Sequence, residues 1–105
     1  ASLRWRPIAM PLDYPQPEVE AEIVAREARV ELSTARRLVE LATRVRKLED
    51  LGLTETVSTR LLVYAATVIG AGVPPRQACE LAIAQPLSDD ADVVQTIRDL
   101  AALVF

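Results

Sequence analysis

Apolar residues recur at steps of three and four along most of the chain, and this spacing predicts amphipathic helices. The pattern is most regular over residues 34–50. The apolar positions there predict a buried helix face: Leu38, Leu41, Val45 and Leu48. The charged positions predict a solvated face on the opposite side: Arg36, Arg37, Glu40, Arg44, Arg46 and Lys47. Ser33 is the expected N-cap of this helix, and Gly52 is the expected left-handed residue that closes it.

One further helix is predicted before this element and another after it. The earlier helix runs from Pro17 to Ala28, with acidic residues in its first turns, where the helix dipole favours them. Its expected apolar face is Val19, Ile23 and Val24. The later helix runs from Thr59 to about Ala71, with Ser58 as its N-cap. Its apolar band is wide enough for the central helix of a domain: Leu61, Leu62, Ala65, Val68 and Ile69.

Two more helices complete the predicted set. Pro74 and Pro75 begin a short one, and Pro86 is expected to end it because proline lacks the amide donor and clashes with the preceding turn. Cys79 lies on the apolar face of this helix and is expected to pack there. The last helix follows Ser88 and has these inward positions: Val93, Val94, Ile97, Leu100 and Ala101.

These elements predict an all-α fold, a small bundle of about five helices over residues 15–105, after a short extended segment at residues 1–14. A chain of 105 residues is long enough for one compact core. Between Arg6 and Tyr14, Pro7 and Pro11 cannot donate to a central ladder, so this segment is at most an edge strand. The chain also starts in mid-pattern, which suggests a piece of a longer protein.

Composition argues against several functions. A formal net charge of −3 disfavours a surface built to neutralise nucleic-acid phosphates. Without histidine and with Cys79 as the only cysteine, the chain has no plausible zinc ligand set and no Ser-His or Cys-His nucleophile. It has no GxxxxGK[ST] phosphate loop, so it cannot hydrolyse nucleotide alone. The apolar stretch from Leu61 to Val73 is too short to span a membrane, and no signal peptide is visible. We expect a cytoplasmic, metal-free domain.

Two kinds of charged cluster leave alternatives open. Asp89, Asp90 and Asp92 could form a carboxylate site, but three acids at the start of a helix are also expected for capping and for the dipole. Two arginine pairs could hold an anionic partner: Arg36 with Arg37, and Arg44 with Arg46. A solvated face is the alternative, since these acids lie nearby: Glu40, Glu49 and Asp50.

Arg60 stands out because it falls in the first turn of a predicted helix, where a cation faces the positive end of the dipole. A phosphate bound there would make the arrangement favourable, so the corner formed by Ser58, Thr59 and Arg60 is a candidate anion site. The alternative is an exposed arginine whose aliphatic stem covers its neighbours.

Three segments resemble a known family. Residues 52–66, GLTETVSTRLLVYAA, are similar to the sensor-2 segment of MoxR-type AAA+ ATPases, in which an arginine at the start of a lid helix reaches the nucleotide's terminal phosphates. The match falls on Arg60. Residues 10–27, MPLDYPQPEVEAEIVARE, resemble the crossing from the ATPase core into its lid. Residues 85–100, QPLSDDADVVQTIRDL, resemble the C-terminal tail of the CbbQ/NirQ/NorQ group.

The resemblance implies the C-terminal lid of a hexameric remodelling chaperone that uses ATP and Mg²⁺. The lid would contact the AAA+ core of its own chain and neighbouring subunits, while the machine would work with a von Willebrand factor A-type partner on a client metalloenzyme such as rubisco or nitric oxide reductase. The opening SLRWRP resembles the end of the core, where Arg6, with Arg4 in reserve, matches an arginine finger by position. The family usually has an aromatic residue where this chain has Pro7. The alternative is a helical protein–protein interaction module without nucleotide contact.

Overall fold

A computed structural model of the chain describes residues 14–48 and 57–105, and this described part contains helices and no strand. The elements are α1 (Pro17–Ala28), α2 (Leu32–Arg46), α3 (Thr59–Gly70), α4 (Pro75–Cys79), the π-helix η2 (Glu80–Ala84), α5 (Gln85–Leu87) and α6 (Ala91–Val104). Because α4, η2 and α5 follow one another without a break, the described residues form five helical rods. The predicted all-α class is confirmed, while the expected edge strand falls mostly on residues 1–13, outside the described part.

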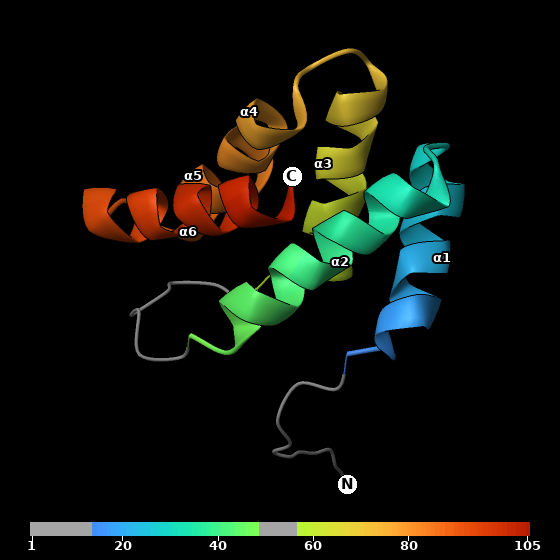
Figure 1. Cartoon of the computed structure of the whole chain (residues 1–105), viewed down its shortest axis with the longest axis horizontal. Helices are drawn as coiled ribbons and strands as arrows, with labels where there is room; N and C mark the ends of the chain where they lie inside the picture. The colour runs from blue at the N-terminus through green and yellow to red at the C-terminus, as the bar shows by residue number, and fades with distance from the viewer. Residues whose placement is uncertain (1–13, 49–56) are drawn as a thin grey trace, which may run out of the picture.

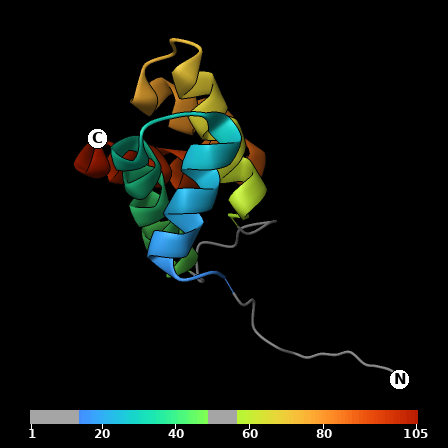
Figure 2. The same cartoon turned by 90° about the vertical axis from the view of Figure 1, so that its right-hand side faces the viewer.

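The rods pack around a core made almost wholly of aliphatic side chains. Helix α2 crosses the molecule from α1 to α6 (Figure 1). Helix α1 lies between α2 on one side and α3 on the other (Figure 2). Helix α3 also contacts α4 and η2, so it links the two halves of the bundle. Leu38, Leu62 and Ile97, from three different helices, are completely buried in this core.

The turn between α1 and α2 is closed by a left-handed residue that is not glycine. Arg29 has φ 59° and ψ 48°, and the amide of Val30 donates to the carbonyl of Ala25 at 3.1 Å. This six-to-one hydrogen bond satisfies a carbonyl at the end of α1 and reverses the chain within three residues. The sequence contains no glycine or asparagine at this position, so the left-handed turn could not be predicted from it.

The predicted bounds of α1 are confirmed, but its predicted apolar face is partly wrong. Val24 is buried as expected, whereas Val19 is 48% exposed and Glu20 is only 1% exposed. The buried face is therefore rotated from the predicted stripe, and it contains a carboxylate. Glu20 is tolerated there because an arginine and a threonine from other helices hydrogen-bond to it.

Helix α2 starts and ends earlier than predicted. It begins at Leu32 with Glu31 as N-cap, so Ser33 lies inside the first turn and does not cap it. It ends at Arg46, and Lys47 in a right-handed conformation follows, so Gly52 does not close the helix. Gly52 itself lies outside the described residues. The buried face contains the predicted residues Leu38, Leu41 and Val45, and Leu48 is half-buried.

Pro86 does not end the helix in which it lies. The helix continues to Leu87, because the turn before the proline is π-helical and shifts the hydrogen bonds by one residue: the Gln85 amide bonds the Glu80 carbonyl. Pro86 then lies in the first turn of α5, where a missing amide donor has little consequence. Leu87 is buried as a result.

The last helix follows its prediction closely. Asp90 is the N-cap of α6, and its Oδ1 accepts a hydrogen bond of 2.8 Å from the Asp92 amide. The Ser88 hydroxyl accepts from the Asp90 amide at 3.0 Å and fixes the preceding turn. Val93, Ile97 and Ala101 are buried. In the described part of the chain, no helix combines the length and the apolar character needed to cross a membrane.

Candidate functional site

Helix α3 begins at a conventional N-cap. Ser58 has an extended backbone, and its Oγ accepts a hydrogen bond of 3.2 Å from the Leu61 amide, which confirms the predicted cap. The carbonyl of Ser58 accepts from the Leu62 amide at 3.3 Å. The first amides of a helix have no intrahelical acceptor, so those of Thr59 and Arg60 are directed outward from the helix start.

Arg60 is the second residue of α3, and its side chain is exposed. Within residues 14–48 and 57–105 it makes no side-chain hydrogen bond and no ion pair. No charge among the described side chains therefore compensates its guanidinium at the positive end of the helix dipole, an arrangement that an added anion would make favourable.

Thr59 faces the opposite way, into the domain. Its hydroxyl donates a hydrogen bond of 2.8 Å to Oε2 of Glu20 in α1. Glu20 also receives two hydrogen bonds from Arg46 at the end of α2: Nη1 to Oε1 at 2.9 Å and Nη2 to Oε2 at 2.8 Å. This parallel geometry is the strongest arrangement available to an arginine and a carboxylate. The three candidate residues of the predicted anion site therefore have different surroundings. Ser58 caps α3, Thr59 binds a buried ion pair, and the Arg60 side chain is exposed.

Arg46 also holds the segment that leads into α3. Its Nε and Nη2 donate to the Val57 carbonyl at 2.9 and 2.8 Å. The guanidinium carbon of Arg46 also lies over the Tyr14 ring, 3.6 Å from the ring centre, in a cation–π contact. Arg46 therefore connects the residues before α1, the end of α2 and the start of α3.

The ion pair determines the charge state of Glu20. Burial raises the pKa of this carboxyl, but the hydrogen bonds from Arg46 and Thr59 and the charge of Arg46 outweigh it, so its pKa lies below the ordinary value of 4.5. The pair is ionised at neutral pH, and its two charges cancel inside the domain. Among the described residues, the pair therefore adds no net charge beside the start of α3, where Arg60 is an exposed cation.

Sequence reasoning missed this ion pair, although its signal was present. Arg46 was placed on the solvated face of its helix, which is wrong, because its side chain is only 11% exposed. Counting back from Arg46 in steps of four and three gives Ala42, Val39 and Ala35, all of which are buried. Arg46 thus continues the apolar face of α2 by one turn, and a charged residue at such a position predicts a buried partner.

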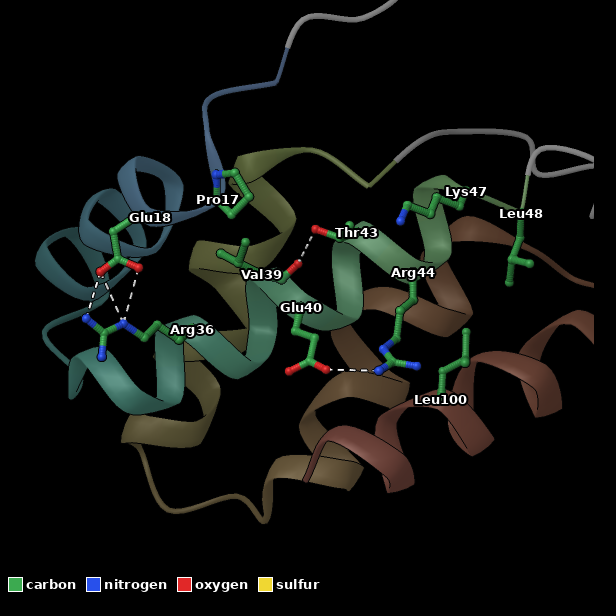
Figure 3. Close-up of a pocket in the computed structure, with 10 residues that line it drawn as sticks. All are labelled: Pro17, Glu18, Arg36, Val39, Glu40, Thr43, Arg44, Lys47, Leu48 and Leu100. Carbon is green, nitrogen blue, oxygen red and sulfur yellow. Dashed lines mark hydrogen bonds and ion pairs between the residues drawn. The ribbon is translucent and has the colours of Figure 1, made fainter.

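The other arginines of α2 lie on the surface, as predicted. Arg36 pairs with Glu18 through Nη2 and Oε2 at 2.7 Å, and Arg44 pairs with Glu40 at 3.0 Å. Together with Lys47, they edge a groove of about 760 Å³ along α2 (Figure 3). Val39, Leu48 and Leu100 supply apolar surface to the groove, and Pro17 lies at its α1 end. The predicted acids Glu49 and Asp50 lie outside the described residues.

Four further residues have structural roles or lie outside the described part. Asp90 caps α6, so the structure agrees with the capping interpretation of the acidic cluster and not with a carboxylate site. Cys79 is buried, and burial raises the pKa of its thiol to about 12, so the reactive thiolate is strongly disfavoured at neutral pH. Arg4 and Arg6 lie among residues 1–13. No group of three or more acidic or cysteine side chains within the described residues converges on a metal-sized position.

Comparison with known proteins identifies the family. The family described as "CbbQ/NirQ/NorQ C-terminal" matches residues 20–104. The chain belongs to the CbbQ/NirQ/NorQ C-terminal family. It is 49% identical over 104 residues to Protein CbbQ of Hydrogenophilus thermoluteolus, and 46% identical over 104 residues to Protein NorQ of Paracoccus denitrificans. It is 44% identical over 102 residues to the denitrification regulatory protein NirQ of Pseudomonas aeruginosa.

These alignments cover nearly the whole of this chain but a minor part of each relative. They include 99%, 99% and 97% of the chain, and 39%, 38% and 39% of CbbQ, NorQ and NirQ respectively. The match to the CbbQ/NirQ/NorQ C-terminal family begins at Glu20 and therefore contains the buried ion pair as well as Arg60. The predicted membership of this group is confirmed, and the described helices are those of its C-terminal domain.

Proposed function

We propose that this chain is the nucleotide-sensing C-terminal lid of an ATP-hydrolysing AAA+ remodelling chaperone. Residues 15–105 form the lid, and residues 1–14 form the end of the AAA+ core or the linker to the lid. The core supplies the phosphate loop and binds ATP with Mg²⁺. Membership of the CbbQ/NirQ/NorQ C-terminal family supports the proposal, as does the fact that the chain spans 38–39% of the length of these relatives. The domain lacks a nucleotide-hydrolysing motif of its own and would act on chemistry carried out elsewhere.

The observation that carries the sensor role is the position of Arg60. An exposed guanidinium at the second position of α3, without a partner among the described side chains, can contact an ATP phosphate that the core presents to it. The amides of Thr59 and Arg60 add donors at the same helix end. We assign the phosphate contact to these groups and not to the hydroxyls of Ser58 and Thr59, which are engaged in the cap and with Glu20.

This placement gives a mechanism in which binding energy moves the lid. ATP with Mg²⁺ supplies the phosphate charge and the bond that is broken. Arg60 stabilises the closed arrangement of lid and core while that charge is present, and the favourable contact weakens when the terminal phosphate leaves. A ligand shifts such an equilibrium only by its difference in affinity for the two states, and Arg60 is the group that provides this difference.

The parent machine is proposed to be a cytoplasmic hexamer. Its lid would meet the AAA+ core of the same chain and of neighbouring subunits, and the assembly would act with a von Willebrand factor A-type partner on a client metalloenzyme of the rubisco or nitric oxide reductase type. The name of the relative NirQ, a denitrification regulatory protein, agrees with the second kind of client. In this arrangement Arg6, or Arg4, would point to the nucleotide of the neighbouring subunit.

The test compares two arginines at the same helical position. Arg76 is exposed and is the second residue of α4, as Arg60 is of α3. In the full-length protein, Arg60→Ala should lower ATP turnover by about 100- to 1,000-fold, the range typical when one preorganised donor to developing charge is removed. Arg76→Ala should leave turnover unchanged. Equal turnover in wild type and both variants would refute the sensor role.

The groove along α2 supports a second candidate, a protein-interaction module that never meets nucleotide. Its apolar floor and charged edges suit an amphipathic segment of a partner. The double reversal Arg36→Glu and Arg44→Glu, at two cations that line the groove, should abolish binding of such a partner while ATP turnover persists. Retention of every partner in a pull-down from the full-length protein would count against this alternative.

A further inference from the structure

The buried ion pair has no obvious justification in stability alone. A buried pair of charges loses its hydration, and an apolar pair of similar volume often stabilises a core equally well or better. Glu20 is 1% exposed and Arg46 11% exposed, in a core that is almost wholly aliphatic. What the charged pair offers beyond apolar packing is direction, because hydrogen bonds fix orientation whereas apolar burial does not.

The directed bonds of the pair converge on the start of α3. Arg46 binds the carbonyl of Val57 through two nitrogens, and Glu20 accepts from the hydroxyl of Thr59. These two anchors lie on either side of Ser58, the N-cap, and the second lies directly before Arg60 in the chain. The first turn of α3 is thus fixed to α1 through Glu20 and to α2 through Arg46.

Resting on the proposed sensor function, we infer that Glu20, Arg46 and Thr59 are positioning residues that hold Arg60 in register with the nucleotide. Tyr14 extends the same connection to the residues before α1, since its ring lies against the Arg46 guanidinium. Under the proposed domain division, residue 14 is the last residue of the segment that ends the core or links it to the lid. Through the Arg46 side chain, the network would therefore couple the orientation of the residues before α1 to that of Arg60.

Thr59 offers the most selective test. Thr59→Val removes the hydroxyl that binds Glu20 but preserves the shape of the side chain and leaves the Glu20–Arg46 bonds in place. Thr59→Ser keeps a hydroxyl and serves as the conservative variant. In hydrogen–deuterium exchange, Thr59→Val should make the Leu61 and Leu62 amides, which are hydrogen-bonded to Ser58 at the start of α3, exchange faster. Residues 65–70 should be unchanged, and the thermal midpoint should fall only slightly.

Activity is then measured in the full-length protein. Thr59→Val should lower ATP turnover roughly fivefold through misplacement of Arg60, and Thr59→Ser should restore most of it. Binding of a fluorescent ATP analogue should weaken in parallel. The double variant Thr59→Val with Arg60→Ala should be only slightly slower than Arg60→Ala alone, because the Thr59 hydroxyl acts mainly by placing the Arg60 side chain and affects the two first amides of α3 less.

The outcomes separate this inference from the function on which it rests. Wild-type turnover in Arg60→Ala would refute the sensor function itself. Reduced turnover in Arg60→Ala with wild-type turnover and exchange in Thr59→Val would leave the sensor intact and refute the positioning role. A double variant whose loss equals the product of the two single losses would also refute it, since Thr59 would then act independently of Arg60.

Discussion

Glu20 and Arg46 meet through two parallel hydrogen bonds of 2.9 and 2.8 Å, although 26 residues separate them and both lie on faces that are otherwise apolar. The pair joins the first turn of α1 to the last turn of α2, so it locks the two helices of the hairpin at the end opposite their connecting turn. It also supplies partners for the Val57 carbonyl and the Thr59 hydroxyl. The consequences for stability can be tested separately from nucleotide binding.

Removal of one partner should be strongly destabilising. Arg46→Met leaves the Glu20 carboxylate buried without its counter-charge and leaves the Val57 carbonyl without a donor. We expect a loss of about 3–5 kcal/mol in the free energy of unfolding, measured by urea denaturation. The matched control is Arg36→Met, which breaks the exposed pair with Glu18 and should change the free energy of unfolding very little.

Removal of both partners should be less harmful than removal of Arg46 alone. In the double variant Glu20→Leu with Arg46→Met, no buried charge remains, and the two apolar side chains can fill a similar volume. If the double variant is less stable than Arg46→Met, the pair contributes net stability, and the explanation of its presence by orientation alone is wrong.

The pair also predicts a specific dependence on pH. The pKa of Glu20 is lowered in the folded protein from 4.5, so its ionised form contributes stability that is fully present above pH 4.5 and is lost as the pH falls through the folded value. The difference in unfolding free energy between wild type and Glu20→Gln should therefore shrink as the pH falls below 4.5. Other carboxyls titrate in both proteins and cancel in the difference. A gap that stays constant from pH 6 down to pH 3 would contradict the assignment.

The helices could be predicted from the sequence because their signals are local. Ser58 and Asp90 are caps that stand directly before an apolar period of three and four; Ser58 was predicted as the cap, and Asp90 was predicted only as one of three acids at a helix start. The end of α2 was misplaced because the apolar period continues to Leu48, beyond the last helical residue. Pro86 was misjudged because the π-helical turn that accommodates it depends on packing against other helices and has no signature in the sequence.

In the candidate site, too, the part with a local signal could be predicted and the part that depends on tertiary contacts could not. Arg60 was identified because its position conflicts with the helix dipole, and this conflict can be seen in a single helix. The network beneath it was missed because Glu20, Arg46 and Thr59 lie on three different helices. Each of them has an ordinary local explanation, as an acid in a first turn, a base in a last turn and a residue after a cap. Only their meeting in the folded domain shows that they form one group.

The acidic cluster at α6 should behave as a cap and not as a cation site. Asp90→Ala removes the acceptor of the Asp92 amide and should lower the free energy of unfolding by about 1 kcal/mol. Asp89→Ala, which removes a neighbouring exposed carboxylate, should change it by less than about 0.5 kcal/mol. Both values can be taken from urea denaturation. An equal loss in the two variants, or a rise in the thermal midpoint of wild type on adding Mg²⁺ or Ca²⁺, would indicate a shared carboxylate site instead.

Arg60 should be a residue that the fold does not need. In the 105-residue chain without nucleotide, Arg60→Ala removes a cation from the positive end of α3 and introduces a better helix former, so the free energy of unfolding should stay equal or rise by at most about 1 kcal/mol. Arg76→Ala, at the same position of α4, should behave in the same way. A clear loss of stability in Arg60→Ala alone would mean that the arginine has a structural partner, and a decline in ATP turnover could then be explained by unfolding. If stability is equal in the two variants while turnover falls only in Arg60→Ala, the loss of turnover comes from a contact that Arg60 makes outside this domain and not from unfolding.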